Sequence, residues 1–209
     1  MTIRTIDDLT RDLGSLSGKR VMVRVDFNVP MDSGRVTDAT RLDRAVPTVR
    51  RLSEAGAKVI LLSHFGRPKG QRNEAMSLRP VADAFADALG KPVGFTDDAV
   101  GERTARAIAG LQPGDVLLLE NTRFHAGEEA NDETFARALA ENADAFAARF
   151  APMFAAEDYL TGEPYAALAA LFARVDSYAS GASDRPETED TLRAAAAATL
   201  ARLNGENTT

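Results

Sequence analysis

Cysteine is absent from this chain of 209 residues, and histidine occurs only twice. The lack of thiols excludes disulfide frameworks, thiolate metal sites and cysteine nucleophiles. Two histidines are too few for a zinc site that needs three of them. No apolar run approaches the ~18 residues of a membrane-spanning helix, and the N-terminus is polar and acidic where a secretory signal would be apolar. We therefore expect a soluble, cytoplasmic protein.

An excess of basic residues is lacking too. The chain carries 25 Lys and Arg against 31 Asp and Glu, a formal net charge of −6. The overall field of an acidic chain does not attract nucleic acid or anionic membranes, so neither is an expected partner. The composition, with 44% hydrophobic and 27% charged residues, is that of a globular protein with enough apolar material for a core.

Several motifs for nucleotide, metal and acyl chemistry are missing. The sequence contains no GxxxxGK[ST] phosphate loop, no GxGxxG dinucleotide turn and no GxSxG nucleophile elbow. Residues 26–31 begin like a calcium loop, but Pro30 and Met31 stand where a ligand and a glycine are required. The sequence therefore predicts that this chain alone binds no metal and no cofactor.

The chain changes composition near residue 147. All four lysines and both histidines lie in residues 1–146, whereas all three tyrosines lie in the alanine-rich residues 147–209. In this second part, apolar residues recur at helical spacing over 165–178 and 192–203. We predict an α/β domain over 1–146 and a helical tail over 147–209, whose apolar stripes are typical of packing rather than chemistry.

Short apolar runs alternate with helix-like segments in residues 1–146. Runs rich in branched residues span 21–27, 58–64, 92–97 and 116–121, and apolar residues spaced by three and four span 41–55, 78–89 and 99–111. This alternation is typical of a parallel β-sheet with right-handed crossovers. The predicted fold class is therefore α/β, with helices on both faces of a parallel sheet.

Basic residues follow two of the predicted strands at their carboxyl ends, where open parallel sheets bind ligands. His64 and Arg67 follow the second strand, and Arg123 and His125 follow the fourth, while Arg41 begins the first long helix. Guanidinium groups pair with carboxylates and phosphates. The convergence of Arg41, Arg67 and Arg123 with His64 on one edge of the sheet therefore predicts a small anionic ligand. The alternative is that the arginines are solvated and only cap helices or pair with acidic side chains.

Polar side chains also interrupt the first strand and follow the third. Arg24, Asp26 and Asn28 form one row, although a covered parallel strand is apolar on both faces. They either line a site or anchor a loop by hydrogen bonds. The pair Asp97 and Asp98 favours an N-cap for a following helix over a metal site.

Four segments resemble the phosphoglycerate kinase family and occur in the family's order. They are RVMVRVDFNVP at 20–30, TDATR at 37–41 with Pro47 and Thr48, SHFGRPKG at 63–70, and GDVLLLENTRFH at 114–125. The resemblance runs from about residue 3 to residue 146 and covers the family's N-terminal, substrate-binding domain. It implies phosphoryl transfer between ATP and 3-phosphoglycerate, with Mg-ATP or Mg-ADP held by a C-terminal domain.

The resemblance also implies roles for individual residues. Those assigned to substrate binding are Asp26, Phe27, Asn28, Arg41, His64, Phe65, Gly66, Arg67 and Arg123. Asp26 and Asn28 would contact the hydroxyl and carboxyl end of the glycerate. The histidine and the arginines after the strands would bind its carboxylate and phosphate. Arg41 would have the catalytic role of stabilising charge on the transferring phosphoryl group.

After Phe146 the sequence departs from the family pattern. The family continues with an HRAHA segment and a further substrate arginine, whereas residues 147–153 read AARFAPM. Residues 147–209 contain no lysine and no glycine-rich nucleotide element, so the nucleotide site implied by the family is missing. Two alternatives stay open: a truncated, recombined kinase fragment, and a non-catalytic binding module whose tail contacts a protein partner or a second copy.

Overall fold

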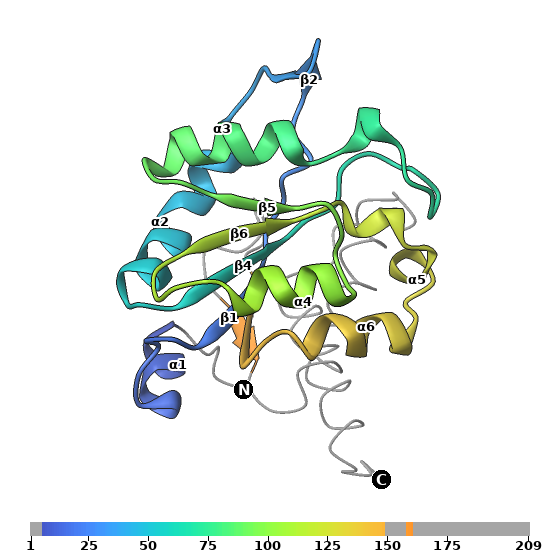
Figure 1. The fold of residues 1–209 in the computed structure, drawn as a ribbon. Helices are drawn as coiled ribbons and strands as arrows, with labels where there is room; N and C mark the ends of the chain where they lie inside the picture. Colours follow the sequence, from blue (N-terminus) through green and yellow to red (C-terminus); the bar gives the residue numbers. More distant parts are fainter. Residues whose placement is uncertain (1–5, 149–157, 161–209) are drawn as a thin grey trace, which may run out of the picture.

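The structure, a computed structural model, describes residues 6–148 and 158–160. Six strands form one sheet in the order β5-β6-β4-β1-β7-β8 (Figure 1). They are β1 (Arg20–Arg24), β4 (Lys58–Leu62), β5 (Gly94–Thr96), β6 (Val116–Leu119), β7 (Ala145–Ala148) and β8 (Asp158–Leu160). Every neighbouring pair is parallel except β7 with β8, which is antiparallel. A short hairpin of β2 (Met31–Asp32) and β3 (Arg35–Val36) projects at the top of Figure 1.

Helices cover both faces of the sheet, as predicted. The helices are α1 (Ile6–Leu13), α2 (Thr40–Glu54), α3 (Arg79–Leu89), α4 (Glu102–Ala109), α5 (Ala126–Glu129) and α6 (Glu133–Ala140), with 3-10 turns η1 (Glu74–Met76) and η2 (Thr122–Phe124). Alternate strand residues enter two cores because successive side chains point to opposite faces. Val23 and Leu61 pack with α2 and α3, whereas Met22 and Ile60 pack with α4 and α6. Figure 1 shows these helix pairs on opposite sides of the sheet.

The first strand ends three residues earlier than its apolar pattern suggests. The pattern extends to Phe27, but β1 ends at Arg24. Val25 still donates its backbone N–H to the carbonyl of Leu62 at 2.9 Å. Phe27 has left the strand, and its fully buried ring packs on that of Phe85 with centroids 4.8 Å apart. The segment is therefore apolar because it continues into the core.

The start of the tail differs from the prediction. The expected boundary after residue 146 falls inside β7, where Val23 pairs with Ala147 and Arg24 with Ala148. Residues 158–160, expected to be part of a helical tail, form β8 instead. A strand at the edge of a sheet presents a row of unpaired backbone groups. Pairing with β8 satisfies such groups on β7. The helices predicted over 165–178 and 192–203 lie outside the described residues.

No helix in the described part of the chain is long and apolar enough to cross a membrane.

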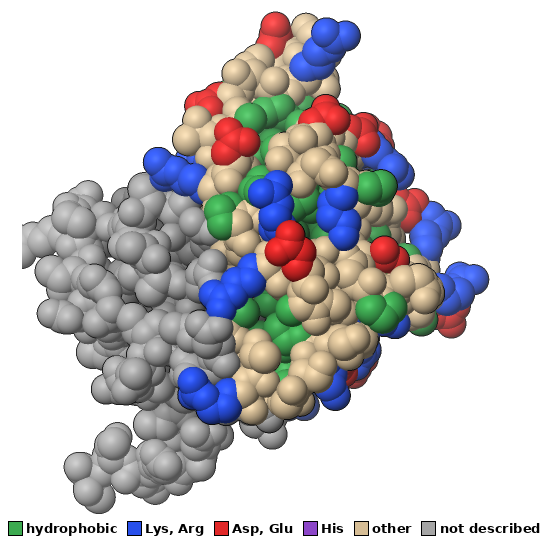
Figure 2. Space-filling model, turned by 90° about the vertical axis from the view of Figure 1, so that its left-hand side faces the viewer, with side chains coloured by type: hydrophobic (Ala, Val, Ile, Leu, Met, Phe, Trp, Pro, Cys, Tyr) green, Lys and Arg blue, Asp and Glu red, His purple; other side chains and the backbone are tan. Residues whose placement is uncertain are grey.

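On the face in Figure 2, Lys and Arg side chains are interspersed with Asp and Glu, and hydrophobic side chains form small groups between them. The charge on this face is therefore mixed rather than of one sign.

Candidate functional site

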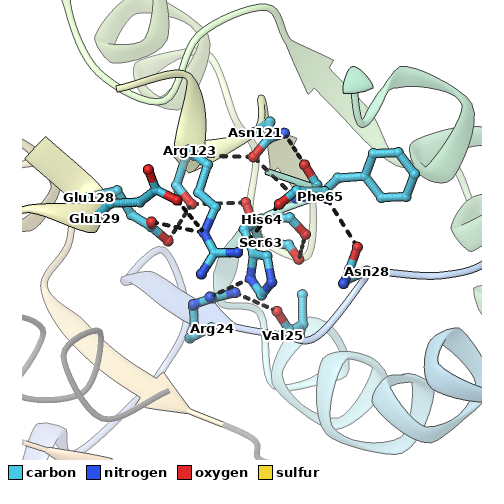
Figure 3. Close-up of polar contacts among 12 residues, drawn as sticks. Arg24, Val25, Asn28, Ser63, His64, Phe65, Asn121, Arg123, Glu128 and Glu129 are labelled. Atoms are coloured by element: carbon cyan, nitrogen blue, oxygen red, sulfur yellow. Dashed lines mark hydrogen bonds and ion pairs between the residues drawn. The ribbon is translucent and has the colours of Figure 1, made fainter. Parts of the chain in front are cut away.

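The parallel strands bring three polar segments to one edge of the sheet. Arg24 ends β1, Ser63 and His64 follow β4, and Asn121 follows β6 after one residue. Thr122 donates both its backbone N–H and its hydroxyl to the carbonyl of Ser63, each at 3.1 Å. The loops after β4 and β6 are therefore joined at this edge (Figure 3).

His64 lies buried at the centre of this edge, with 4% of its surface exposed. Arg24 Nη2 lies 2.9 Å from His64 Nδ1, and Arg24 Nη1 donates to the carbonyl of Val25 at 2.8 Å. A guanidinium can only donate, so His64 Nδ1 accepts and the ring proton lies on Nε2. His64 is thus a neutral histidine with one donor left.

The charges around His64 also favour the neutral form of its ring. Burial, followed by the positive charge of Arg24, lowers the pKa of His64 from 6.5 to about 2. The positive charges of three more arginines contribute to this shift: Arg123, Arg41 and Arg67. We call His64 and these four arginines the arginine site. It combines positive charges from four separate segments, namely the end of β1, the start of α2, the loop after β4 and η2, with a neutral imidazole.

Arg123 is the most buried of the predicted ligand-binding arginines, at 5% exposure. Its Nε donates to Glu128 Oε2 at 3.1 Å, and its Nη1 donates to the carbonyl of Gly66 at 3.3 Å. Glu128, from α5, is itself 2% exposed, so the pair is held away from water (Figure 3). A buried charge needs such a partner.

Arg41 is exposed and forms an ion pair with half-buried Asp26. The pair joins the start of α2 to the loop after β1. Next to it, Asp38 accepts hydrogen bonds from the side chain and backbone of Thr40, and these bonds lower the pKa of Asp38. The backbone N–H of Asn28 donates to Asp26 Oδ1 at 3.2 Å. The acidic residue predicted to bind a hydroxyl therefore orients Arg41 in this structure.

Gly66 and Phe65 form the turn between His64 and Arg67. Gly66 adopts a left-handed φ of +61° and donates its N–H to Asn28 Oδ1 at 3.1 Å. Phe65 is half-buried against the core. Exposed Arg67 follows this turn. The turn therefore carries two members of the arginine site on one short piece of backbone.

The predicted site residues divide by what their side chains reach. Hydrogen bonds, an ion pair or the charges around His64 join most of them: Asp26, Asn28, Arg41, His64, Gly66, Arg67 and Arg123. Phe27 differs, because its ring is in the core and only its backbone N–H reaches this edge, donating to Ser63 Oγ at 3.0 Å. Whether each of them binds a ligand stays a prediction.

Two other residues near strand ends, His125 and Asp98, contact each other rather than the arginine site. His125 shares the edge only in sequence, since its Nε2 contacts Asp98 Oδ1 at 2.7 Å and its ring stacks on Phe135. Asp98 is not the expected N-cap, because α4 begins at Glu102 with Gly101 as its cap. Besides its contact with His125, Asp98 Oδ1 accepts a hydrogen bond from the backbone N–H of Ala99 at 2.7 Å.

Three members of the edge were not identified as site residues: Arg24, Asn121 and Glu128. The polar row in the first strand did point to Arg24. Nothing local in the sequence identifies Glu128 as a site residue. It contacts Arg123 because α5 packs against η2. Among the described residues, no group of three or more His, Cys, Asp or Glu side chains could hold a metal ion. Guanidinium groups such as those at this edge are suited to pairing with carboxylates and phosphates.

Comparison with known proteins agrees with the motifs. The family model described as phosphoglycerate kinase matches residues 10–150. A phosphoglycerate kinase of Methylobacterium radiotolerans is 62% identical over 143 residues, which are 68% of this chain and 35% of that protein. One from Rhodopseudomonas palustris is 59% identical over 143 residues, covering 68% of this chain and 34% of the relative.

Solved structures show the same similarity. Phosphoglycerate kinase from Coxiella burnetii has a TM-score of 0.63 at 31% identity, over 86% of this chain and 45% of that one. The enzyme from Pyrococcus horikoshii has a TM-score of 0.58 at 29% identity, over 64% of this chain and 34% of that one. The chain thus spans about a third of the length of the curated relatives it matches.

Proposed function

This chain belongs to the phosphoglycerate kinase family, and from that premise we propose that its arginine site binds 3-phosphoglycerate. The observation that carries the proposal is the gathering of four arginines around a buried, neutral His64 at the carboxyl edge of the sheet. A ligand with a carboxylate, a hydroxyl and a phosphate offers acceptors for these donors.

The arginines are suited to different parts of such a ligand. Arg41 and Arg67 are exposed, so they can adjust to an incoming anion. Arg123 is held by Glu128, and His64 by Arg24, so these two provide fixed contacts. We assign Arg41 to the phosphoryl group, where a positive charge stabilises the transfer. We assign the neutral His64 to donation from Nε2.

Titration calorimetry with 3-phosphoglycerate tests this proposal on the full chain. We expect binding by the wild type and at least a tenfold weaker affinity for Arg41→Ala and for Arg67→Ala, because each removes a charged hydrogen bond to the ligand. Arg137→Ala is the matched control, since Arg137 is an exposed arginine paired with Glu133 on α6. Its affinity should equal that of the wild type within twofold.

Two results would contradict the proposal. One is the absence of a heat change for the wild type at millimolar ligand. The other is equal binding by the wild type and by a double variant that lacks both Arg41 and Arg67.

A further inference from the structure

One side chain connects the two loops that carry most of the arginine site. Asn121 is fully buried directly beyond β6. Its Oδ1 accepts from the backbone N–H of Phe65 and from that of Arg123, each at 3.1 Å. Its Nδ2 donates to the carbonyl of Phe65 at 2.7 Å and to that of Met76 at 3.0 Å. All four hydrogen bonds go to backbone groups.

The backbone that Asn121 holds is the backbone that carries the ligand-binding side chains. Phe65 lies between His64 and Arg67 in the sequence, and both of its peptide groups are bound by Asn121. The same side chain fixes the N–H of Arg123 in the loop after β6. Figure 3 shows Asn121 between Phe65 and Arg123, with Arg24 on the far side of His64. A change at Asn121 is therefore transmitted to both loops.

We propose that Asn121 is a positioning residue that sets the distance between the His64–Arg67 turn and Arg123, and through it the affinity of the arginine site for 3-phosphoglycerate. The inference rests on the proposed function. Asn121 itself faces backbone groups rather than the ligand. Its role is to hold the guanidinium and imidazole donors at the separation that one small anion can bridge, because displaced donors lose much of their binding energy.

The chemistry of the position favours a carboxamide. The site asks for one acceptor that serves two N–H groups and one donor group that serves two carbonyls, and only Asn and Gln side chains offer both. The neighbouring Glu120 is buried and already accepts from Leu78 N, Asn121 N and Ser77 Oγ. A second carboxylate at 121 would face two carbonyl oxygens beside this charge, with no donor for either.

Two substitutions at this position test the proposal by calorimetry with 3-phosphoglycerate. Asn121→Asp keeps the shape and loses the donors, and Asn121→Ala loses both. The matched control is Leu139→Ala, which also lowers stability. Leu139 is a fully buried residue of α6 in the core that α4 and α6 form with the sheet. All variants are titrated at a temperature where circular dichroism shows them folded.

We expect both Asn121 variants to bind at least tenfold more weakly than the wild type, and Leu139→Ala to bind within twofold of it. A pH series adds a readout that a merely structural role would not move. Acid protonates the carboxyl introduced by Asn121→Asp and restores one donor. The ratio of its dissociation constant to that of the wild type should therefore decrease as the pH is lowered from about 7.5 to about 5.5.

The outcomes separate the two proposals. Binding by the wild type together with equal affinity in a folded Asn121 variant overturns the positioning role and leaves the proposed function intact. Equal weakening by Leu139→Ala also overturns it, because loss of stability alone would then explain the effect. If Asn121→Ala does not fold, Asn121→Asp and its pH series decide. No binding by the wild type overturns the proposed function and this inference together.

Discussion

The neutral state of His64 has consequences for how the arginine site handles pH. A protonated imidazole there would lie buried among four positive charges, and burial and those charges together lower its pKa to about 2. The guanidinium of Arg24 also occupies Nδ1, the atom that would otherwise take the proton. Across the physiological range, the charge of the site therefore comes from its arginines, which stay protonated.

The same shift makes folding stability depend on pH. In the unfolded chain His64 titrates near 6.5, whereas in the folded chain its pKa is about 2. Between these values the unfolded state binds the additional proton, so stability is complete above pH 6.5 and decreases as the pH falls toward 2. From about pH 7 to about pH 5, His64 should cost about 2 kcal/mol of the free energy of unfolding.

Urea unfolding at both pH values measures this contribution. His64→Asn keeps an acceptor for Arg24 but does not titrate, so the wild type should lose about 2 kcal/mol more than the variant on acidification. All other titrating groups are common to both proteins and cancel in the comparison. An equal loss in both proteins would show that His64 is protonated in the folded state.

At the residue scale, the sequence predicted chemical types better than partners. It indicated that His64, Arg67 and Arg123 follow strand ends, which is a local property of the pattern. The partners depend on which loops meet. Arg24 and His64 are 40 positions apart, and nothing near Arg24 identifies that contact. His125 also follows a strand near an arginine, as His64 does, yet it contacts Asp98 instead of the arginine site.

Among the elements, the short helix α5 supports the arginine site. It spans only Ala126–Glu129, but it carries Glu128, the buried partner of Arg123. The loop after β4 returns to the start of this helix. Gly70 adopts a φ of +70°, and a Cβ built on it would lie 2.8 Å from both Cα and Cβ of Ala126. The close approach requires glycine.

We expect Gly70→Ala to destabilise the protein more than Gly90→Ala does. Gly90 ends α3 with a φ of +77° and has nothing within 4 Å of a built Cβ. Both substitutions pay about 1 kcal/mol for the left-handed backbone. Gly70→Ala should cost about 1–3 kcal/mol more because α5 must move. Urea unfolding of both variants provides the measurement, and equal losses would mean that α5 gives way without cost.

The two longest helices could be predicted, whereas the β2–β3 hairpin and α5 could not. Helices α2 and α3 contain 15 and 11 residues, enough for several turns of a 3.6-residue period. Strands β2 and β3 have two residues each and α5 has four. No period can be recognised in so few residues, and these elements form because the flanking chain brings them together. The hairpin and α5 therefore appear only in the structure.

At the scale of the whole molecule, our proposal gives this chain one side of a two-sided reaction. Phosphoryl transfer needs the donor nucleotide and its metal in line with the acceptor. The arginine site, our proposed acceptor site, lies entirely in the α/β part of the chain. Residues 147–209 contain no lysine and no glycine-rich nucleotide motif. The chain also spans about a third of the length of its curated relatives.

We therefore expect no turnover when the chain alone is given ATP, magnesium and 3-phosphoglycerate in a coupled assay. The complementary reaction contains the C-terminal domain of a relative, such as the Methylobacterium radiotolerans protein, supplied as a separate chain. Any rate gained there should disappear in Arg41→Ala and persist in Arg137→Ala. Clear turnover by the chain alone would mean that residues 147–209, or a second copy, provide a nucleotide site.

The sequence by itself determined the α/β class, the family and the kind of residue at each strand end, because periodicity, motifs and charge are local properties of the chain. Tertiary structure decided which of those residues act together. It placed Phe27 in the core, paired His125 with Asp98, made His64 neutral through Arg24, and put Asn121 between two loops. Each of these outcomes depends on contacts between segments far apart in sequence, whose distances are set only when the sheet aligns its strands.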